Sequence, residues 1–200
     1  MRVALLIRHG GVADGAEERY RGAADAPMGA AGEAQIRALA ARLAARVRLD
    51  AIYCSDLARS RRTAELLADG RDVAIRVRPA LREIDLGAWQ GRSRREIVEQ
   101  RRAEYDARGR DIVNFRPPGG ESFADLAARV LPCWRALAAD ETGEVVAIAS
   151  HAGVNRVILC HLLGMPLANL FRITQRLGRI DVVEWRKGEP VVTLIDGDDL

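Results

Sequence analysis

Short runs of apolar residues alternate along this chain with longer amphipathic segments, and this alternation restricts the possible folds more than any other feature. Residues 3–7 are continuously apolar, which is typical of a strand buried on both faces. Residues 32–48 carry Ile36, Leu39 and Leu43 at spacings of three and four, so one face of a helix is apolar. Strands and helices that alternate in this way predict an α/β fold with a mainly parallel sheet.

The same periodicities assign elements to most of the chain. Further strands are predicted at residues 51–54, 73–77 and 145–149, and further helices up to residue 68 and at residues 93–108, 123–137 and 153–163. Ser55 or Asp56 can cap the first of these helices, and Ser93 with Glu96 forms a capping box for the second. Residues 180–185 and 191–195 predict a hairpin. We therefore expect a three-layer α/β/α sandwich with a mainly parallel central sheet and a C-terminal antiparallel hairpin. We expect it to form a single domain over residues 1–200.

Composition excludes several classes of protein. Hydrophobic residues make up 48% and charged residues 30%, unlike a disordered or fibrous chain. The first apolar run is too short for a signal peptide or a membrane span, so we expect a cytoplasmic protein without a membrane partner. Three cysteines, Cys54, Cys133 and Cys160, fit neither a disulfide framework nor a closed metal site, and we expect buried free thiols. The net charge of +3 does not by itself define a partner.

Candidate chemistry gathers where the predicted strands end. The first strand is followed by His9 next to Arg8, the second by Ser55 with Arg59 one helical turn later, and the strand at residues 145–149 by His151. Ligands of open α/β sheets bind beyond the carboxyl ends of the strands, so we expect these side chains to converge. His161 lies inside a predicted helix without such a context, and we interpret it as structural.

This set of residues suits phosphoryl transfer. Planar guanidinium groups of Arg8 and Arg59 can bind phosphate oxygens, and a neutral His9 ring can attack phosphorus if its other nitrogen donates to a backbone carbonyl. Protonated His151 would stabilise the charge of the transition state. The departing alkoxide needs an acid, for which Glu83 is the candidate and Asp85 the competitor.

Five segments in the right order resemble the histidine phosphatase superfamily, also called the phosphoglycerate mutase-like family. They lie between residues 6 and 154, about three quarters of the chain. The segments are Leu6-Ile7-Arg8-His9-Gly10; residues 22–28 with Gly32 and Gln35; residues 55–60 with Thr63-Ala64; Leu81-Arg82-Glu83 with residues 87–91; and residues 119–122 followed by residues 150–154.

The resemblance implies roles for these residues. His9 would become the phosphohistidine, Glu83 would donate the proton, and Arg8, Arg59 and His151 would form the phosphate pocket. Three further positions are implied on the substrate side, namely Arg21, Gly22 and Ala152. The family needs no metal, and we expect no cofactor. The run Gly11-Val12-Ala13-Asp14-Gly15 departs from the family pattern of an acidic or amide residue followed by threonine or serine, which leaves the contacts of this loop open.

The short chain, with a modest segment at residues 100–118, favours hydrolysis over mutase activity within the family. The chain is similar to small bacterial phosphatases, including those for alpha-ribazole phosphate, so we expect a metal-independent phosphomonoesterase acting on a small phosphorylated metabolite. A phosphoglycerate mutase and a non-catalytic phosphate-binding module remain alternatives. Trp89, Tyr105 and Phe115 either line the leaving-group pocket or serve packing.

Two further questions concern partners. The arginines of residues 92–110 are interleaved with acidic residues, as on a solvated helix, which argues against nucleic-acid binding. The oligomeric state stays open, with a homodimer as one candidate.

Overall fold

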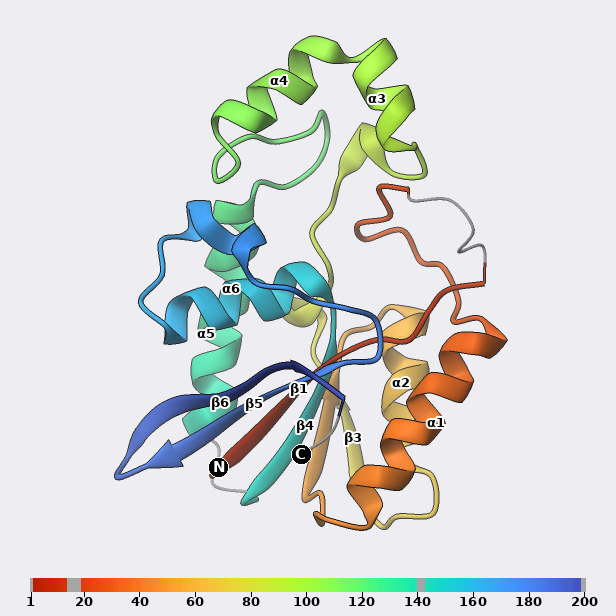
Figure 1. Ribbon diagram of the computed structural model, residues 1–200, viewed down its shortest axis with the longest axis vertical. Coiled ribbons are helices and arrows are strands. Elements are labelled where there is room, and N and C mark those ends of the chain that lie inside the picture. Colours follow the sequence, from red (N-terminus) through yellow and green to blue (C-terminus); the bar gives the residue numbers. More distant parts are fainter. Residues whose placement is uncertain (1, 14–18, 140–142, 199–200) are drawn as a thin grey trace.

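A six-stranded sheet forms the centre of the structure, a computed structural model that describes residues 2–13, 19–139 and 143–198 (Figure 1). Its strand order is β3-β2-β4-β1-β5-β6. The first four strands in this order run parallel, whereas β5 is antiparallel to β1 and pairs with β6 as the predicted hairpin. The strands are β1 (Val3–Arg8), β2 (Ala51–Cys54), β3 (Ala74–Val77), β4 (Val145–Ser150), β5 (Ile180–Arg186) and β6 (Glu189–Gly197).

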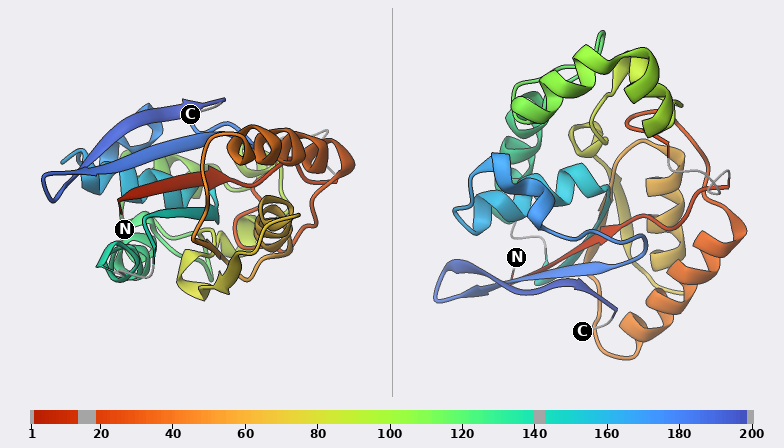
Figure 2. Two further views of the ribbon diagram at one scale, coloured as in Figure 1. Left: turned by 90° about the horizontal axis from the view of Figure 1, so that it is seen from below. Right: turned by 45° about the horizontal axis from the view of Figure 1, so that its top comes forward.

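Helices cover both faces of the sheet (Figures 1 and 2). Helices α1 (Ala30–Ala44) and α2 (Ala58–Ala68) pack on the face that carries Leu5 and Ile7 of β1. Helices α5 (Phe123–Ala139) and α6 (Ala152–Leu162) pack on the opposite face, which carries Leu6. Successive side chains of a strand point to opposite faces, so a continuous apolar run such as that of β1 serves both layers. The predicted three-layer α/β/α fold is confirmed.

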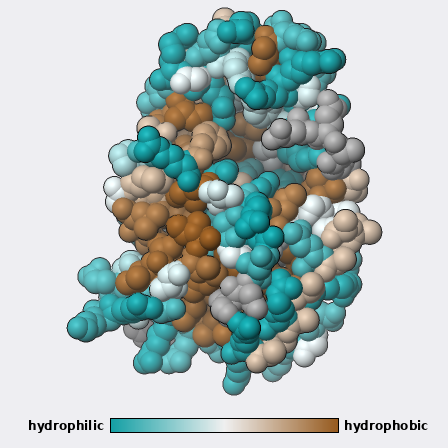
Figure 3. Space-filling model, in the orientation of Figure 1, coloured by the Kyte–Doolittle hydropathy of each residue, from teal (hydrophilic) through white to brown (hydrophobic). Residues whose placement is uncertain are grey.

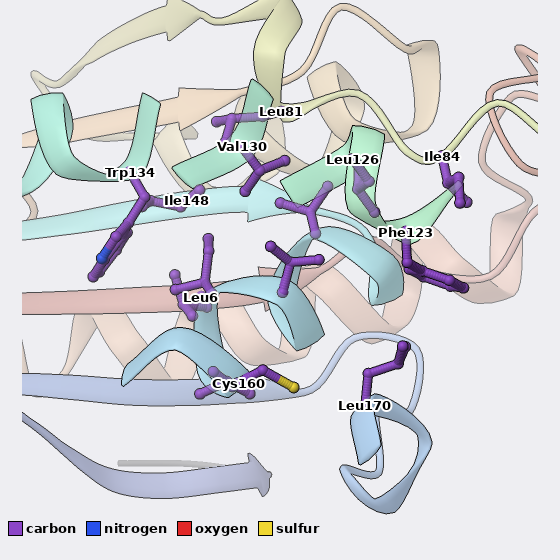
Figure 4. Close-up of a cluster of buried hydrophobic side chains, with 14 of the residues drawn as sticks. Leu6, Leu81, Ile84, Phe123, Leu126, Val130, Trp134, Ile148, Cys160 and Leu170 are labelled. Carbon is purple, nitrogen blue, oxygen red and sulfur yellow. The ribbon is translucent and has the colours of Figure 1, made fainter. Parts of the chain in front are cut away.

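The core between the sheet and helices α5 and α6 is drawn in Figure 4. Leu6 and Ile148 project from β1 and β4 toward Leu126, Val130 and Trp134 of α5, and all five side chains are buried. Full burial of one such side chain contributes roughly 1.5–3 kcal/mol to folding. This packing holds α5 and the start of α6 against the strands that end at the candidate site.

Strand order brings three loops together. Strand β4 lies between β1 and β2, with Arg8 opposite Ser150 and Cys54 opposite Ala149. Parallel strands end at the same edge of the sheet, so the residues that follow β1, β2 and β4 emerge side by side.

The start of α2 differs from the sequence-based prediction. Neither Ser55 nor Asp56 caps this helix, because Leu57 occupies the N-cap position. The carboxylate of Asp25 accepts a hydrogen bond from the Ala58 N–H at 2.7 Å and so satisfies one of the free donors of the first turn. The capping hydrogen bond of α2 therefore comes from a residue distant in sequence, and no local sequence pattern predicts it.

The predicted helix at residues 93–108 is two helices, α3 (Arg94–Gln100) and α4 (Arg102–Arg110), separated by the non-helical backbone of Arg101. The capping box of Ser93 and Glu96 is confirmed. These two helices, here called the cap, stand beyond the carboxyl end of the sheet (Figures 1 and 2). Most of the visible cap surface is hydrophilic in Figure 3.

Shorter elements complete the fold. Turns of 3-10 helix lie at Pro79–Leu81, Gly87–Trp89 and Leu167–Arg172. The three cysteines are free, with Cys54 and Cys160 buried and Cys133 half-buried. Within the described ranges, no helix is long and apolar enough to cross a membrane.

Candidate active site

The side chains at the ends of three neighbouring strands converge as the sequence predicts. His9 follows β1, Ser55 follows β2 and His151 follows β4, and all three are buried. The ring centroids of His9 and His151 are 5.2 Å apart. Arg8, His9, Arg59 and Glu83 line a cavity of about 630 Å³ beyond this edge of the sheet.

His9 is held as a neutral ring with a defined tautomer. Its Nδ1 lies 2.8 Å from the carbonyl oxygen of Gly10, which can only accept, so Nδ1 carries the proton. Its Nε2 therefore carries a lone pair, which accepts a hydrogen bond from Arg59 Nε at 3.2 Å. Burial first, and then the charge of Arg59, lower the pKa of His9 to about 3. The ring thus presents an unprotonated Nε2 at neutral pH, as a nucleophile requires.

His151 differs from the expectation that it acts as a cation. Complete burial, together with nearby His9 and Arg59, holds the pKa of His151 well below its usual value, so it is neutral at pH 7 when no ligand is bound. Its Nε2 lies 2.8 Å from the Ser55 hydroxyl, and that oxygen already accepts from the Leu57 N–H. Of the two neutral tautomers, the one with the proton on Nδ1 accepts the Ser55 hydroxyl hydrogen at Nε2. Nδ1 is buried without a partner among the described residues, so in this tautomer a neutral His151 can donate one hydrogen bond.

Two arginines are anchored by main-chain carbonyls rather than by carboxylates. Arg59 is buried, and its terminal nitrogens donate to the carbonyl oxygens of Ala24 at 2.6 Å and Gly22 at 2.7 Å. Arg8 donates from Nη1 to the carbonyl oxygen of Gln175, and its Nε is buried without a partner in the described part of the chain. A guanidinium has five N–H donors, so both side chains keep donors for an anion. Burial is the main cause that lowers the pKa of each.

A buried polar chain supports the position of Arg8. The side chain of Gln175 accepts from Asn155 at 2.8 Å and donates to both carboxylate oxygens of Asp181 at 2.8 Å. Asn155 in turn bonds to the hydroxyl of Ser150, the residue before His151. Sequence analysis missed this network because its members come from four separate segments.

Glu83 reaches the cavity from the irregular segment between β3 and α3. Its carboxylate accepts hydrogen bonds from the Ile84 N–H at 3.0 Å and from the Gly153 N–H at 3.1 Å. The charge of Glu83 acts on both Arg8 and Arg59. The competing candidate Asp85 instead accepts from the Gly87 N–H at 2.8 Å and does not line the cavity that contains His9.

Arg129 and Glu121 hold the segment that carries Glu83. Arg129 forms a two-nitrogen pair with Glu121 at 2.8 Å and donates to the carbonyl oxygens of Ala80, Arg82 and Glu83. Such paired, hydrogen-bonded geometry restrains the backbone of this segment more firmly than a single ion pair.

Replacement of Gly153 by alanine tests how closely Glu83 is positioned. A Cβ at residue 153 would lie 2.4 Å from Oε1 of Glu83, so the carboxylate would have to move. We expect Gly153→Ala to lower kcat by about 10- to 100-fold, because small misplacement of the candidate acid Glu83 is costly, while the melting temperature changes little. Gly109→Ala in helix α4, where a new Cβ meets nothing within 4 Å, is the matched control. Steady-state kinetics of Gly153→Ala with unchanged kcat would contradict this role for Gly153.

Three further predicted positions lie at the same cavity, whose lining includes Arg21, Gly22 and Ala152. Gly22 has a φ of +51°, and a Cβ there would lie 2.6 Å from the carbonyl oxygen of Ile84, so only glycine fits. In the loop that departs from the family pattern, Gly11 and Val12 line the cavity, whereas Asp14 and Gly15 lie outside the described residues.

The three aromatic residues for which the sequence left two roles open, the leaving-group pocket or packing, serve packing. Trp89 is fully buried and donates from its indole nitrogen to Glu104 at 2.7 Å, and Phe115 packs against its ring. Tyr105 accepts a hydrogen bond from Arg94. None of these three lines the cavity that contains His9.

Other aromatic and basic residues form the cavity wall in their place. They are Tyr20, Phe123, Phe171, Arg19, Arg108 and Arg156. Phe171 is 51% exposed in a 3-10 turn far along the chain, so no periodicity in the sequence distinguishes it.

The chain resembles known proteins over nearly its whole length. Residues 4–197 match the histidine phosphatase superfamily (branch 1). The adenosylcobalamin/alpha-ribazole phosphatase of Salmonella typhimurium is 34% identical over 182 residues, which cover 90% of each chain. The probable phosphoglycerate mutase GpmB of Enterobacter sp. (strain 638) is 32% identical over 186 residues, which cover 90% of this chain and 84% of that protein. The crystal structure of the alpha-ribazole phosphatase from Shigella flexneri matches with a TM-score of 0.90 and 26% identity, covering 99% of this chain and 98% of that one.

Proposed function

Because this chain belongs to the histidine phosphatase superfamily and is a phosphatase, we propose that it hydrolyses phosphomonoesters of small metabolites through a phosphohistidine at His9, without a metal ion. The observation that carries this proposal is the state of His9. Its Nε2 is unprotonated, faces Arg59, and belongs to a ring whose Nδ1 is tied to the Gly10 carbonyl.

Phosphate binding would use the donors that are not yet satisfied. Arg8 and Arg59 surround the anion with guanidinium N–H groups, and Nδ1 of His151 adds one neutral donor. Donors already held in place by carbonyls and by Ser55 need little rearrangement as charge develops on the phosphoryl oxygens.

In the first step the lone pair of His9 Nε2 attacks phosphorus, and the bond from phosphorus to the ester oxygen breaks. Glu83 gives its proton to the departing oxygen, so the alcohol leaves neutral. In the second step water attacks the phosphohistidine, Glu83 takes a proton from that water, and the bond from Nε2 to phosphorus breaks to release inorganic phosphate. One carboxyl group thus acts first as acid and then as base.

A rapid-quench experiment with a ³²P-labelled phosphomonoester in the presence of a chelator tests the proposal. We expect acid-labile label on the protein within one turnover, located on His9 by peptide mapping. Substrates for the screen include alpha-ribazole phosphate, because relatives are named for it, and phosphoglycerates. Turnover that requires a divalent metal, or that passes through no labelled protein, would contradict the proposed mechanism.

A phosphoglycerate mutase is the second candidate, because relatives of similar identity carry that name. It predicts that transfer of phosphate between the two hydroxyl groups of glycerate greatly exceeds release of inorganic phosphate. The single-domain organisation, the cytoplasmic location and a homodimer stay predictions.

A further inference from the structure

The cavity carries more positive charge than one phosphate group needs. Six arginines line it, whereas Glu83 is the single carboxylate in its described lining. Arg8 and Arg59 belong to the proposed phosphate site. Two of the others, Arg108 on helix α4 of the cap and Arg156 on helix α6, have no role in the mechanism above.

Neither Arg108 nor Arg156 has a carboxylate partner among the residues that the structure describes. Arg108 makes no hydrogen bond or ion pair there, and Arg156 donates only from Nε to the carbonyl oxygen of Ile173 at 2.9 Å. Elsewhere in the chain, Arg116 forms a two-nitrogen pair with the carboxylate of Asp125. Burial is the main cause that lowers the pKa of both Arg108 and Arg156, so each charge is partly desolvated without a carboxylate in direct contact among the described residues.

Aromatic rings hold these two guanidinium groups in place. The Cζ atoms of Arg108 and Arg156 lie 5.4 Å and 5.1 Å from the centre of the Phe171 ring, and Arg108 also lies 6.0 Å from the Tyr20 ring. A cation–π contact occupies none of the five N–H donors of a guanidinium with an acceptor atom, so these donors remain able to bind an anion. Both side chains are therefore positioned and still able to bind an anion.

The two arginines come from different elements around the cavity. Arg156 is in the second turn of helix α6, which begins directly after His151, and the charges of Arg8 and Glu83 act on it. Arg108 is in helix α4 of the cap, beyond the carboxyl end of the sheet, so Arg156 is the nearer of the two to the proposed phosphate site. This order follows the direction in which the alcohol part of a bound ester would extend.

We propose that Arg108 and Arg156, which both lie over the Phe171 ring, form a second anion-binding subsite, so that the preferred substrates are phosphomonoesters whose alcohol carries a carboxylate or a second phosphate. This inference rests on the proposed function and specifies its substrate class. Uncharged alcohols, including the nucleoside of alpha-ribazole phosphate, leave the subsite unpaired and are the poorer substrates.

Matched substrates test the subsite on the intact protein. The ratio of kcat/KM for 3-phosphoglycerate to that for glycerol 3-phosphate compares a carboxylate with a neutral hydroxymethyl group on similar carbon chains. Propane-1,3-diol bisphosphate reports on a second phosphate, and alpha-ribazole phosphate on an uncharged nucleoside. We expect the wild type to prefer one of the two esters that carry a second anionic group by about 100-fold, the scale of two charged hydrogen bonds, one from each arginine.

Arg108→Gln should lower this preference by about 10-fold, and Arg108→Gln combined with Arg156→Gln by about 100-fold, mainly through KM. Arg110→Gln, on the same helix but exposed and outside the cavity lining, is the control for which the ratio stays at the wild-type value. Arg108 makes no hydrogen bond to a described residue, so its replacement should not prevent folding, and thermal unfolding verifies this.

The outcomes separate the subsite from the activity. A wild type that hydrolyses 4-nitrophenyl phosphate but prefers glycerol 3-phosphate or alpha-ribazole phosphate overturns the subsite and leaves the phosphatase proposal standing. The same conclusion follows if Arg108→Gln leaves the ratio unchanged. A wild type that hydrolyses none of these esters, 4-nitrophenyl phosphate included, overturns the proposed function itself.

Discussion

Replacement of His9 by alanine is expected to lower kcat for phosphomonoester hydrolysis by about 10⁴- to 10⁶-fold, the scale on which loss of a nucleophile acts in other hydrolases. The reason is structural. His9 supplies the unprotonated Nε2 at the cavity, and the nearby His151 cannot replace it because its Nε2 faces the buried Ser55 hydroxyl and its ring is outside the cavity lining. Stopped-flow release of 4-nitrophenol, together with the labelling experiment above, measures the effect.

A matched histidine control is available for this variant. His161 is exposed near the end of helix α6 and lies outside the cavity, so His161→Ala should retain wild-type kcat. Binding of inorganic phosphate by His9→Ala, measured by calorimetry, shows whether the pocket is still folded. Full turnover by a folded His9→Ala protein would exclude the phosphohistidine route.

The second large effect concerns Glu83. We expect Glu83→Gln to lower kcat by about 10²- to 10⁴-fold for esters of ordinary alcohols, the usual contribution of general acid catalysis. Departure of 4-nitrophenolate needs little protonation, so phosphorylation of His9 by 4-nitrophenyl phosphate should be slowed far less. The later attack of water on the phosphohistidine still lacks its base, so protein phosphorylated on His9 should accumulate.

Asp85→Asn distinguishes the two acid candidates. An asparagine keeps an oxygen that can accept from the Gly87 N–H, so this variant should preserve the turn and leave the kinetics close to wild type. A burst of 4-nitrophenol with Glu83→Gln, but not with Asp85→Asn, is the expected pattern. Equal slowing of Glu83→Gln on both kinds of leaving group would argue that Glu83 acts by position or charge rather than as an acid.

Much of the fold follows from local patterns. The apolar run of β1, the spacing of Ile36, Leu39 and Leu43 in α1, and the capping box at Ser93 each predict their element. Interactions between residues that are near in sequence decide these features, and a single sequence displays them. Two features were not predictable. The split between α3 and α4 depends on the backbone conformation of Arg101, and the hydrogen bond to the first turn of α2 comes from the distant carboxylate of Asp25.

The candidate site divides in a similar way. That His9, His151 and Arg59 converge could be predicted, because parallel strands end at one edge and each residue follows such a strand. The neutral state of His151 could not, since it results from complete burial and from the nearby His9 and Arg59 of other segments. The role of Trp89 stayed open between the leaving-group pocket and packing, because a sequence does not reveal whether such a ring points into the core or into the cavity.

The sequence by itself therefore determined which elements form and which reactive side chains stand at their ends, because periodicity and strand-end position are local properties. Tertiary structure alone decided the neutral state of His151, the close contact between Gly153 and the Glu83 carboxylate, and the positions of Arg108 and Arg156 over the Phe171 ring. Those properties depend on desolvation and on contacts of a few ångströms between segments far apart in the chain, which exist only once the layers have packed.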